Sequence, residues 1–334
     1  MLHTKKTITL QKAAELTSNI HMAYYVVAAD RLGFTYEVLI PGLLVEFSSG
    51  EKHWRIHKAL TPINDSVAMS ITSYKNICNE FLRNQGFTVP RQKLVSSADE
   101  IHSFMEEEQI THIVIKPTRG FGGIGVTIQP KTETEIRRAF RLAEKKSMST
   151  SKNKVIVEEF ISGKHYRLVV LGDTLIAASE RMPPHVTGDG THTIDELITI
   201  ENNTLTQKGR SKIKLDDESD KALETQNVTL GTVLKKDTTV IVRFNANMTS
   251  GGSTRECLDE VDPVYRTTAI SIAQTTGLRL AGIDLITPNI ADPEGTFAIN
   301  EVNHNPGLRI HYLPDYGKPV DIAKIILQYI KSNI

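Results

Sequence analysis

Cysteines and long hydrophobic runs are both scarce in this sequence. Only Cys78 and Cys257 occur among 334 residues, so a disulfide scaffold is excluded and a zinc site built from thiolates is disfavoured. Two isolated thiols are typical of a protein in a reducing compartment. No apolar stretch approaches the roughly 18 residues that a membrane-spanning helix needs. Residues 1–6 lead into polar sequence without the apolar segment of a signal peptide. We therefore expect a cytoplasmic protein with no membrane partner.

An excess of charge of either sign is also missing. Lysine plus arginine and aspartate plus glutamate both number 39, which gives a formal net charge of zero. Nucleic-acid binding normally needs a basic face, so no nucleic-acid partner is expected. Hydrophobic residues at 40% and charged residues at 23% are typical of a globular protein with a substantial core. The length suggests about two domains.

Helix-like and strand-like segments follow one another in an irregular order. Helical spacing predicts helices at residues 11–32, 66–85, 133–146, 263–276 and 320–331. Short apolar runs predict strands at residues 36–40, 43–47, 113–116, 155–158, 166–171, 174–181, 240–244, 280–286 and 297–302. The polar stretch 202–236 is interpreted as a mobile insertion with one short helix. This order indicates an α+β protein and not a doubly wound sheet.

A glycine-rich loop follows the predicted strand 113–116. Gly120, Gly122 and Gly125 fit the pattern G-x-G-x-x-G, but a strand-like run follows where a dinucleotide fingerprint would open a helix. The lysine and hydroxyl residue that close a P-loop are missing, as are the H-R-D and D-F-G sequences of protein kinases. Glycines let backbone N–H groups approach an anion, and Lys116 adds a cation at the end of the strand. We interpret the loop as a lid over phosphates; the alternative is a tight glycine hairpin with a surface lysine.

Three oxygen-bearing side chains lie on two predicted strands late in the sequence. Asp284 interrupts an apolar strand, and Glu301 and Asn303 stand two residues apart on one face of the next. Carboxylate and amide oxygens are ligands that Mg²⁺ prefers. The three residues are therefore a candidate metal site; the alternative is a set of core salt bridges with lysine or arginine.

Two polar loops each leave a predicted strand beside an arginine. One covers residues 303–311 and includes Arg309; the other covers residues 247–254 and follows Arg243. Arginine is well suited to binding carboxylate and phosphate groups. We expect the loops to meet at anionic groups of a substrate; the alternative is a pair of exposed turns.

These segments together resemble the ATP-grasp superfamily. The resemblance is closest to the ATP-grasp module of cyanophycin synthetase, and looser to glutathione synthetase modules and D-alanine–D-alanine ligase. Its most specific stretch is residues 181–190, which is similar to the R-x-P-A-x-V-x-G-D-G run of cyanophycin synthetase. Further stretches carry it in the family's order: 73–75 with 87–90, 114–117 with the glycine loop, 157–163, 247–252 and 301–307.

The resemblance implies roles for individual residues. Lys116 and Arg243 would be catalytic and stabilise the transferring phosphoryl group. Asp284, Glu301 and Asn303 would bind two Mg²⁺ ions, for which Mn²⁺ would substitute. ATP would be contacted by Lys75, Lys116, Gly122, Gly123, Glu158, Glu159, Phe160, Ile161 and His165, the last of which stands where the family has an acidic ribose contact. The substrate would be contacted by Arg167, Arg181, His185, Asn247, Ser250, Gly251, Gly252 and Arg309.

The resemblance also implies an ATP-grasp fold, with ATP held between two α+β lobes. Residues 1–70 would form a small N-terminal region on the substrate side. Residues 71–330 would form the ATP-grasp domain, with a nucleotide lid lobe at about 71–157 and a lobe with the hinge, metal and substrate sites at about 158–330.

The implied activity is an ATP-dependent ligase that joins a carboxylate to an amine through an acyl phosphate, releasing ADP and phosphate. Amino acids or peptides are the implied substrates, and a homodimer is an expected state. The alternatives are a small-molecule kinase on the same ATP site and a non-catalytic nucleotide-binding module.

Overall fold

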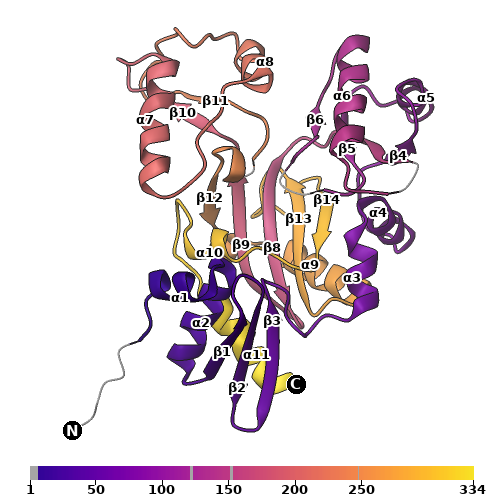
Figure 1. Ribbon diagram of the computed structural model, residues 1–334. Helices are drawn as coiled ribbons and strands as arrows, with labels where there is room; N and C mark the ends of the chain where they lie inside the picture. Colours follow the sequence, from indigo (N-terminus) through magenta and orange to yellow (C-terminus); the bar gives the residue numbers. More distant parts are fainter. Residues whose placement is uncertain (1–6, 121–122, 151–152, 247) are drawn as a thin grey trace.

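A five-stranded sheet lies at the centre of the molecule, and three smaller units surround it (Figure 1). The computed structural model describes residues 7–120, 123–150, 153–246 and 248–334. Within these ranges the sheets have the strand orders β1-β2-β3, β10-β11, β12-β9-β8-β13-β14 and β4-β7-β5-β6. Their strand pairs are antiparallel. This arrangement of helices and antiparallel sheets confirms the predicted α+β class.

The N-terminal unit has two helices and a three-stranded meander. Its elements are α1 (Leu10–Thr17), α2 (Ile20–Leu32), β1 (Thr35–Ile40), β2 (Leu44–Ser49) and β3 (Lys52–His57). The single helix predicted over residues 11–32 is wrong, because Ser18 adopts a left-handed conformation with φ 52° and Asn19 then caps a new helix. The third strand, β3, was not predicted.

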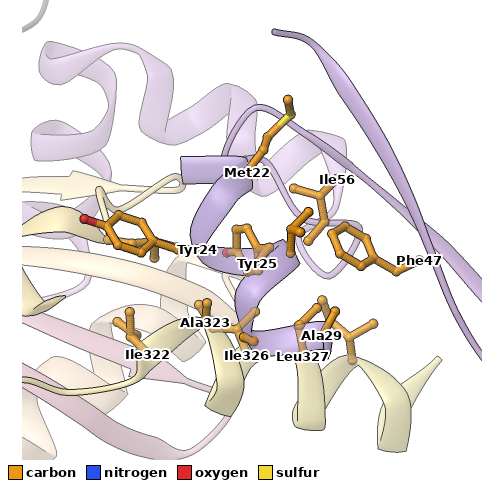
Figure 2. Close-up of a cluster of buried hydrophobic side chains, with 14 of the residues drawn as sticks. Met22, Tyr24, Tyr25, Ala29, Phe47, Ile56, Ile322, Ala323, Ile326 and Leu327 are labelled. Carbon is orange, nitrogen blue, oxygen red and sulfur yellow. The ribbon is translucent and has the colours of Figure 1, made fainter. Parts of the chain in front are cut away.

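The N-terminal unit shares its core with the C-terminal helix α11 (Ile322–Asn333). Figure 2 shows Ile326 of α11 near Ala29 of α2, with Phe47 of the meander in the same buried cluster. Val169 of the central sheet belongs to this cluster too. The N-terminal unit is therefore packed into the rest of the chain through one continuous core.

A second predicted helix is interrupted as well. α3 (Ser66–Ser73) and α4 (Lys75–Asn84) are separated by Tyr74, whose backbone is extended at φ −116° and ψ 112°. The prediction of one helix over residues 66–85 is wrong at this position. The break makes Lys75 the first residue of α4.

A four-stranded sheet and two helices form a lid lobe. Its elements are β4 (Gln92–Val95), α5 (Asp99–Glu107), β5 (Ile113–Pro117), β6 (Thr127–Ile128), α6 (Glu133–Lys146) and β7 (Val155–Glu159). Ile101 of α5, Ala139 of α6 and Val157 of β7 lie in one buried cluster. The helix predicted at 133–146 is confirmed, and a capping box between Thr132 and Glu135 fixes its start.

The central sheet is buried on both faces. Its strands, in spatial order, are β12 (Ser253–Glu256), β9 (Thr174–Met182), β8 (Lys164–Leu171), β13 (Leu280–Thr287) and β14 (Ala298–Asn303). Leu168 of β8 packs in the cluster that includes α9 (Pro263–Thr276), whereas its neighbour Val169 packs toward the N-terminal unit. This alternation is the two-residue period of a strand.

The residues after β9 form an insertion lobe with its own core. Its elements are β10 (His185–Thr187), α7 (Ile194–Gln207), α8 (Asp217–Thr225) and β11 (Thr239–Ile241). Val186, Ile198, Leu223 and Val240 pack together in it. α8 is the one short helix predicted within residues 202–236, whereas α7, which begins before that stretch, was not predicted. Figure 1 shows this lobe and the lid lobe on either side of the upper ends of β8 and β13.

Among the described residues, no helix combines the length and apolar character needed to cross a bilayer.

The remaining helix, α10 (Arg309–Tyr312), is a single turn between β14 and α11.

Candidate active site

A row of charged side chains crosses the central sheet. Arg167 on β8 is in register with Asp284 on β13, and Asp284 is in register with Glu301 on β14. Residues directly opposite one another on antiparallel strands present their side chains on the same face. The register of the sheet therefore brings an arginine and two carboxylates together.

Asp284 is held by two arginines. Arg167 contacts it through Nε and through Nη2, which lies 2.9 Å from Oδ2. Arg181 Nη1 lies 3.2 Å from the same oxygen. Burial raises the pKa of Asp284, but the two guanidinium groups outweigh burial and hold this pKa below its ordinary value. One permanent negative charge is thus shared by two positive charges.

Lys75 pairs with the second carboxylate of the row. Its Nζ lies 3.0 Å from Glu301 Oε1. Burial lowers the pKa of Lys75, but the charge of Glu301 and its hydrogen bond raise it further, so the net shift is upward. The start of α4 therefore carries a fixed cation over the end of β14.

Lys116 meets Glu158 inside the lid lobe. Lys116 Nζ lies 2.5 Å from Glu158 Oε2, and the two side chains are only 7% and 5% exposed. Strands β5 and β7 are neighbours, with Val114 opposite Glu158. An ion pair this deeply buried leaves a costly isolated charge when either partner is removed.

All these side chains line one cleft of about 340 Å³. The structure brings the following predicted residues into its lining: Lys75, Lys116, Gly123, Glu158, Glu159, Phe160, Ile161, His165, Arg167, Arg181, Asp284, Glu301 and Asn303. Residues far apart in the sequence, from the lid lobe and the central sheet, therefore share one cavity. Of the predicted site residues, Gly122 and Asn247 lie outside the described residues.

The predicted hinge is fixed by its neighbours. Glu159 binds Arg91 in a bidentate pair, with Nε–Oε2 at 3.0 Å and Nη2–Oε1 at 2.9 Å. This hydrogen-bonded partner lowers the pKa of Glu159. Phe160 donates its N–H to the carbonyl of His112 at 2.9 Å, so that donor is already used. Burial lowers the pKa of His165, so its imidazole ring is neutral at neutral pH. The resemblance would place an acidic ribose contact at this position.

Arg243 faces the insertion lobe. Its Nη1 lies 2.7 Å from Asp216 Oδ1 and 2.8 Å from the Lys214 carbonyl, and its Nη2 contacts Glu218. Within the described residues, the cleft lining includes Glu218 but omits Arg243. The predicted contact between Arg243 and a phosphoryl group stays a prediction; in this structure the guanidinium is paired with Asp216 and Glu218 of the insertion lobe.

Several predicted substrate contacts also lie away from this cleft. As far as the structure describes the chain, its lining omits His185, Ser250, Gly251, Gly252 and Arg309. His185 Nδ1 is 2.8 Å from the Pro183 carbonyl, and Gly251 packs closely against Ile213 of the insertion lobe. Arg309 Nη2 donates to the Gly209 carbonyl at 3.0 Å. These residues border the insertion lobe and the N-terminal unit.

Some cleft residues were missed by the sequence analysis. Phe244, Asn245 and Ala246 follow Arg243 and lead into the polar loop, so the position of that loop was a usable signal. Glu218 had no such signal, because its helix lies within the stretch that was interpreted as a mobile insertion.

The donor chemistry of Asp284, Glu301 and Asn303 fits Mg²⁺. In the described ranges no cluster of three or more His, Cys, Asp or Glu side chains is arranged as a metal site. The predicted set instead combines two carboxylates with an amide. Asn303 Nδ2 is buried and has no hydrogen-bond partner among the described residues. No hydrogen bond from this atom therefore ties the amide to another part of the protein. Carboxylate and amide oxygens suit a hard divalent cation, and both carboxylates already balance positive charge.

The chain has the ATP-grasp fold. Residues 73–184 match the family model described as phosphoribosylglycinamide synthetase, ATP-grasp (A) domain. A bifunctional glutathione synthetase from Pasteurella multocida has the same fold, with a TM-score of 0.69 and 24% sequence identity over 95% of this chain and 44% of that chain.

Among characterised proteins, the chain is similar to cyanophycin synthetases. It is 33% identical to that of Geminocystis herdmanii over 86% of this chain and 33% of the relative. It is also 29% identical to a glutathione biosynthesis bifunctional protein of Desulfotalea psychrophila, over 81% of this chain and 35% of the relative. The chain thus spans about a third of the length of these relatives.

Proposed function

We propose that this chain is an ATP-dependent ligase that joins the carboxylate of one amino acid or peptide to the amine of another. The observation that carries the proposal is the convergence of Lys75, Lys116, Glu158, Asp284 and Glu301 on one cleft. Lys75 of α4 and Lys116 of the lid lobe line the same cleft as two carboxylates of the central sheet, which suits a nucleotide with its metal ion. The similarity to synthetases of two kinds supports the same reading.

The nucleotide lies between the lid lobe and the central sheet in this proposal. Lys75 and Lys116 hold its phosphates, and the glycine loop with Gly122 and Gly123 covers them. Glu158 accepts a hydrogen bond from the adenine amino group. The segment Glu159, Phe160 and Ile161 forms the adenine hinge, and His165 stands near the ribose.

Asp284, Glu301 and Asn303 would hold Mg²⁺, which would neutralise phosphate charge when bound. Two ions, and Mn²⁺ as a substitute, are part of the proposal. The chain's own cations act on the same charge: Lys116 stabilises the γ-phosphate as it transfers. Arg167 and Arg181 share one carboxylate, so they retain the capacity to bind an anionic substrate group.

The proposed reaction has two steps. An oxygen of the substrate carboxylate attacks the γ-phosphorus, and ADP leaves. The amine then attacks the acyl carbon, phosphate leaves, and the amine proton passes to water. Shielding of the acyl phosphate from water by the lid is the main demand on the protein, so no side-chain nucleophile is needed.

The test is product analysis with purified protein. Pairs of amino acids or peptides are screened with Mg·ATP, and products are identified by mass spectrometry. ADP and phosphate are expected only when both an acid and an amine are present. Release of AMP and pyrophosphate would contradict the proposal, and a stable phosphorylated acid made without any amine would identify a kinase.

A further inference from the structure

Arg309 begins α10, and two polar residues of α2, His21 and Tyr24, lie on the helix against which α10 packs. Tyr24 of α2 is 2% exposed, and its hydroxyl has no hydrogen-bond partner among the described residues. The Nδ1 atom of His21, one turn earlier on α2, is also buried without such a partner. Burial lowers the pKa of His21, and the positive charge of Arg309 lowers it further; burial raises the pKa of Tyr24, and the same charge opposes that rise. A buried polar atom without a partner in the protein is open to a hydrogen bond from water or from a ligand.

Packing fixes the ring of Tyr24, but its hydroxyl has no hydrogen-bond partner among the described residues. It stacks on Tyr312 of α10 with centroids 4.1 Å apart and planes 8° apart. Figure 2 shows the hydroxyl of Tyr24 directed away from the apolar side chains of the cluster, whereas neighbouring Tyr25 lies within them. The packing therefore fixes the ring and points its polar end out of the core.

Arg309 lacks a charge partner. In the described part of the chain its hydrogen bond goes to the Gly209 carbonyl, and no ion pair includes it. A half-buried guanidinium beside two neutral groups leaves a net positive charge, which a carboxylate complements with a charge-assisted hydrogen bond.

The site is connected to the cleft through the loop between β14 and α10. This loop starts at Asn303 in the cleft lining, and Pro306 packs over Gly282 beside the side chain of Arg167. Gly307 then lies against the ring of His21. The loop from Asn303 to Arg309 therefore joins the cleft lining to the start of α10.

We propose that Arg309, His21 and Tyr24 form a carboxylate-binding subsite for a part of the substrate that does not react. The ligand class is an amino acid or peptide with a free carboxylate, held by the guanidinium, the phenol and the imidazole. This inference rests on the proposed ligase function, which it deepens by giving one substrate a second anionic group.

The test measures binding without turnover. Protein with isotope-labelled histidine rings is titrated at neutral pH with glycylglycine, with succinate and with the uncharged glycylglycine amide, and the His21 signal is assigned with the variant His21→Gln. A saturable shift of the His21 signal is expected with at least one carboxylate probe and not with the amide. A response to glycylglycine alone assigns the subsite to the amine-bearing substrate, and a response to succinate alone assigns it to the acid.

Two variants separate recognition from packing. Tyr24→Phe keeps the stacked ring and removes only the hydroxyl, and it is expected to weaken binding about three- to tenfold; Arg309→Gln is expected to weaken it at least about tenfold. Tyr25→Phe is the matched control, because Tyr25 also has a buried hydroxyl without a partner in the described residues but lies inside the core. No shift with either carboxylate, or equal affinity in Tyr24→Phe and wild type, overturns the subsite.

Nucleotide binding is measured in the same variants with Mg·ADP. Loss of carboxylate binding with intact nucleotide binding in Arg309→Gln supports the subsite. Failure of the wild-type protein to bind Mg·ADP, with the His21 shift retained, would contradict the proposed function and leave the subsite standing.

Discussion

Lys116 and Glu158 each depend on the other inside the lid lobe. Because both side chains are buried, Lys116→Met leaves an unpaired carboxylate and is expected to lower the free energy of unfolding by about 3–5 kcal/mol. Adding Glu158→Gln to this variant is expected to recover a large part of the lost stability, because no unpaired buried carboxylate remains. Urea denaturation of the wild type, both single variants and the double variant measures the coupling.

Nucleotide binding separates the two roles of Lys116. The double variant is expected to remain unable to bind Mg·ATP even though its stability recovers. A double variant that is no more stable than Lys116→Met alone would contradict the buried pair.

The two cysteines are expected to be inert in the native protein. Burial raises the pKa of Cys78 and of Cys257 to about 12, so the reactive thiolate is nearly absent at neutral pH. A colorimetric thiol reagent is expected to label both in urea and neither over an hour in native buffer. Rapid native labelling of either thiol would show that its burial is incomplete.

At the scale of the element, the break at Tyr74 links the lid to the cation at the start of α4. The guanidinium of Arg119, next to the glycine loop, lies 5.5 Å from the centre of the Tyr74 ring. Tyr74→Ala removes this cation–π contact and is expected to weaken Mg·ATP binding about two- to fivefold, whereas Tyr74→Phe keeps it. Calorimetric titration of both variants with Mg·ATP tests the expectation. Equal affinities would show that the Tyr74 ring does not contribute to nucleotide binding.

The elements that the sequence predicted best are those with local signals. The helices at 133–146 and 263–276 begin at capping residues and were placed correctly, since Thr132 and Asp262 bond their own first turns. The helices at 11–32 and 66–85 were joined incorrectly because one residue in each, Ser18 and Tyr74, leaves the helical conformation without a glycine or proline to mark it.

The candidate site was predictable where its chemistry appeared as a local motif. Lys116 was predicted from its place at the end of a strand, Asp284 and Glu301 from their places within strands, and Glu158 from the resemblance alone. The ion-pair partner of each charged residue was not predicted, because pairs such as Lys75 with Glu301 depend on how separate elements pack together. His21 and Tyr24 carried no motif at all.

At the scale of the whole molecule, stability is expected to fall on mild acidification. His311 is fully buried, with Nδ1 2.9 Å from Glu256 Oε2, and burial outweighs this carboxylate and lowers the pKa of His311 below 6.5. The unfolded chain therefore takes up a proton before the folded protein does as the pH falls through 6.5, and unfolding becomes easier. Denaturation at pH 7 and pH 5 is expected to show a smaller loss for His311→Gln than for the wild type. An identical loss would assign the acid sensitivity to other groups.

The core around α2 joins segments that lie far apart along the polypeptide. Ala29 of α2, Phe47 of the meander and Ile326 of α11 share one buried cluster, although the lid lobe, the central sheet and the insertion lobe come between them in the sequence. During synthesis the N-terminal meander therefore leaves the ribosome long before α11 does. Its apolar face stays open to chaperones until α11 emerges, so the N-terminal unit completes its core only after the three intervening units have been made.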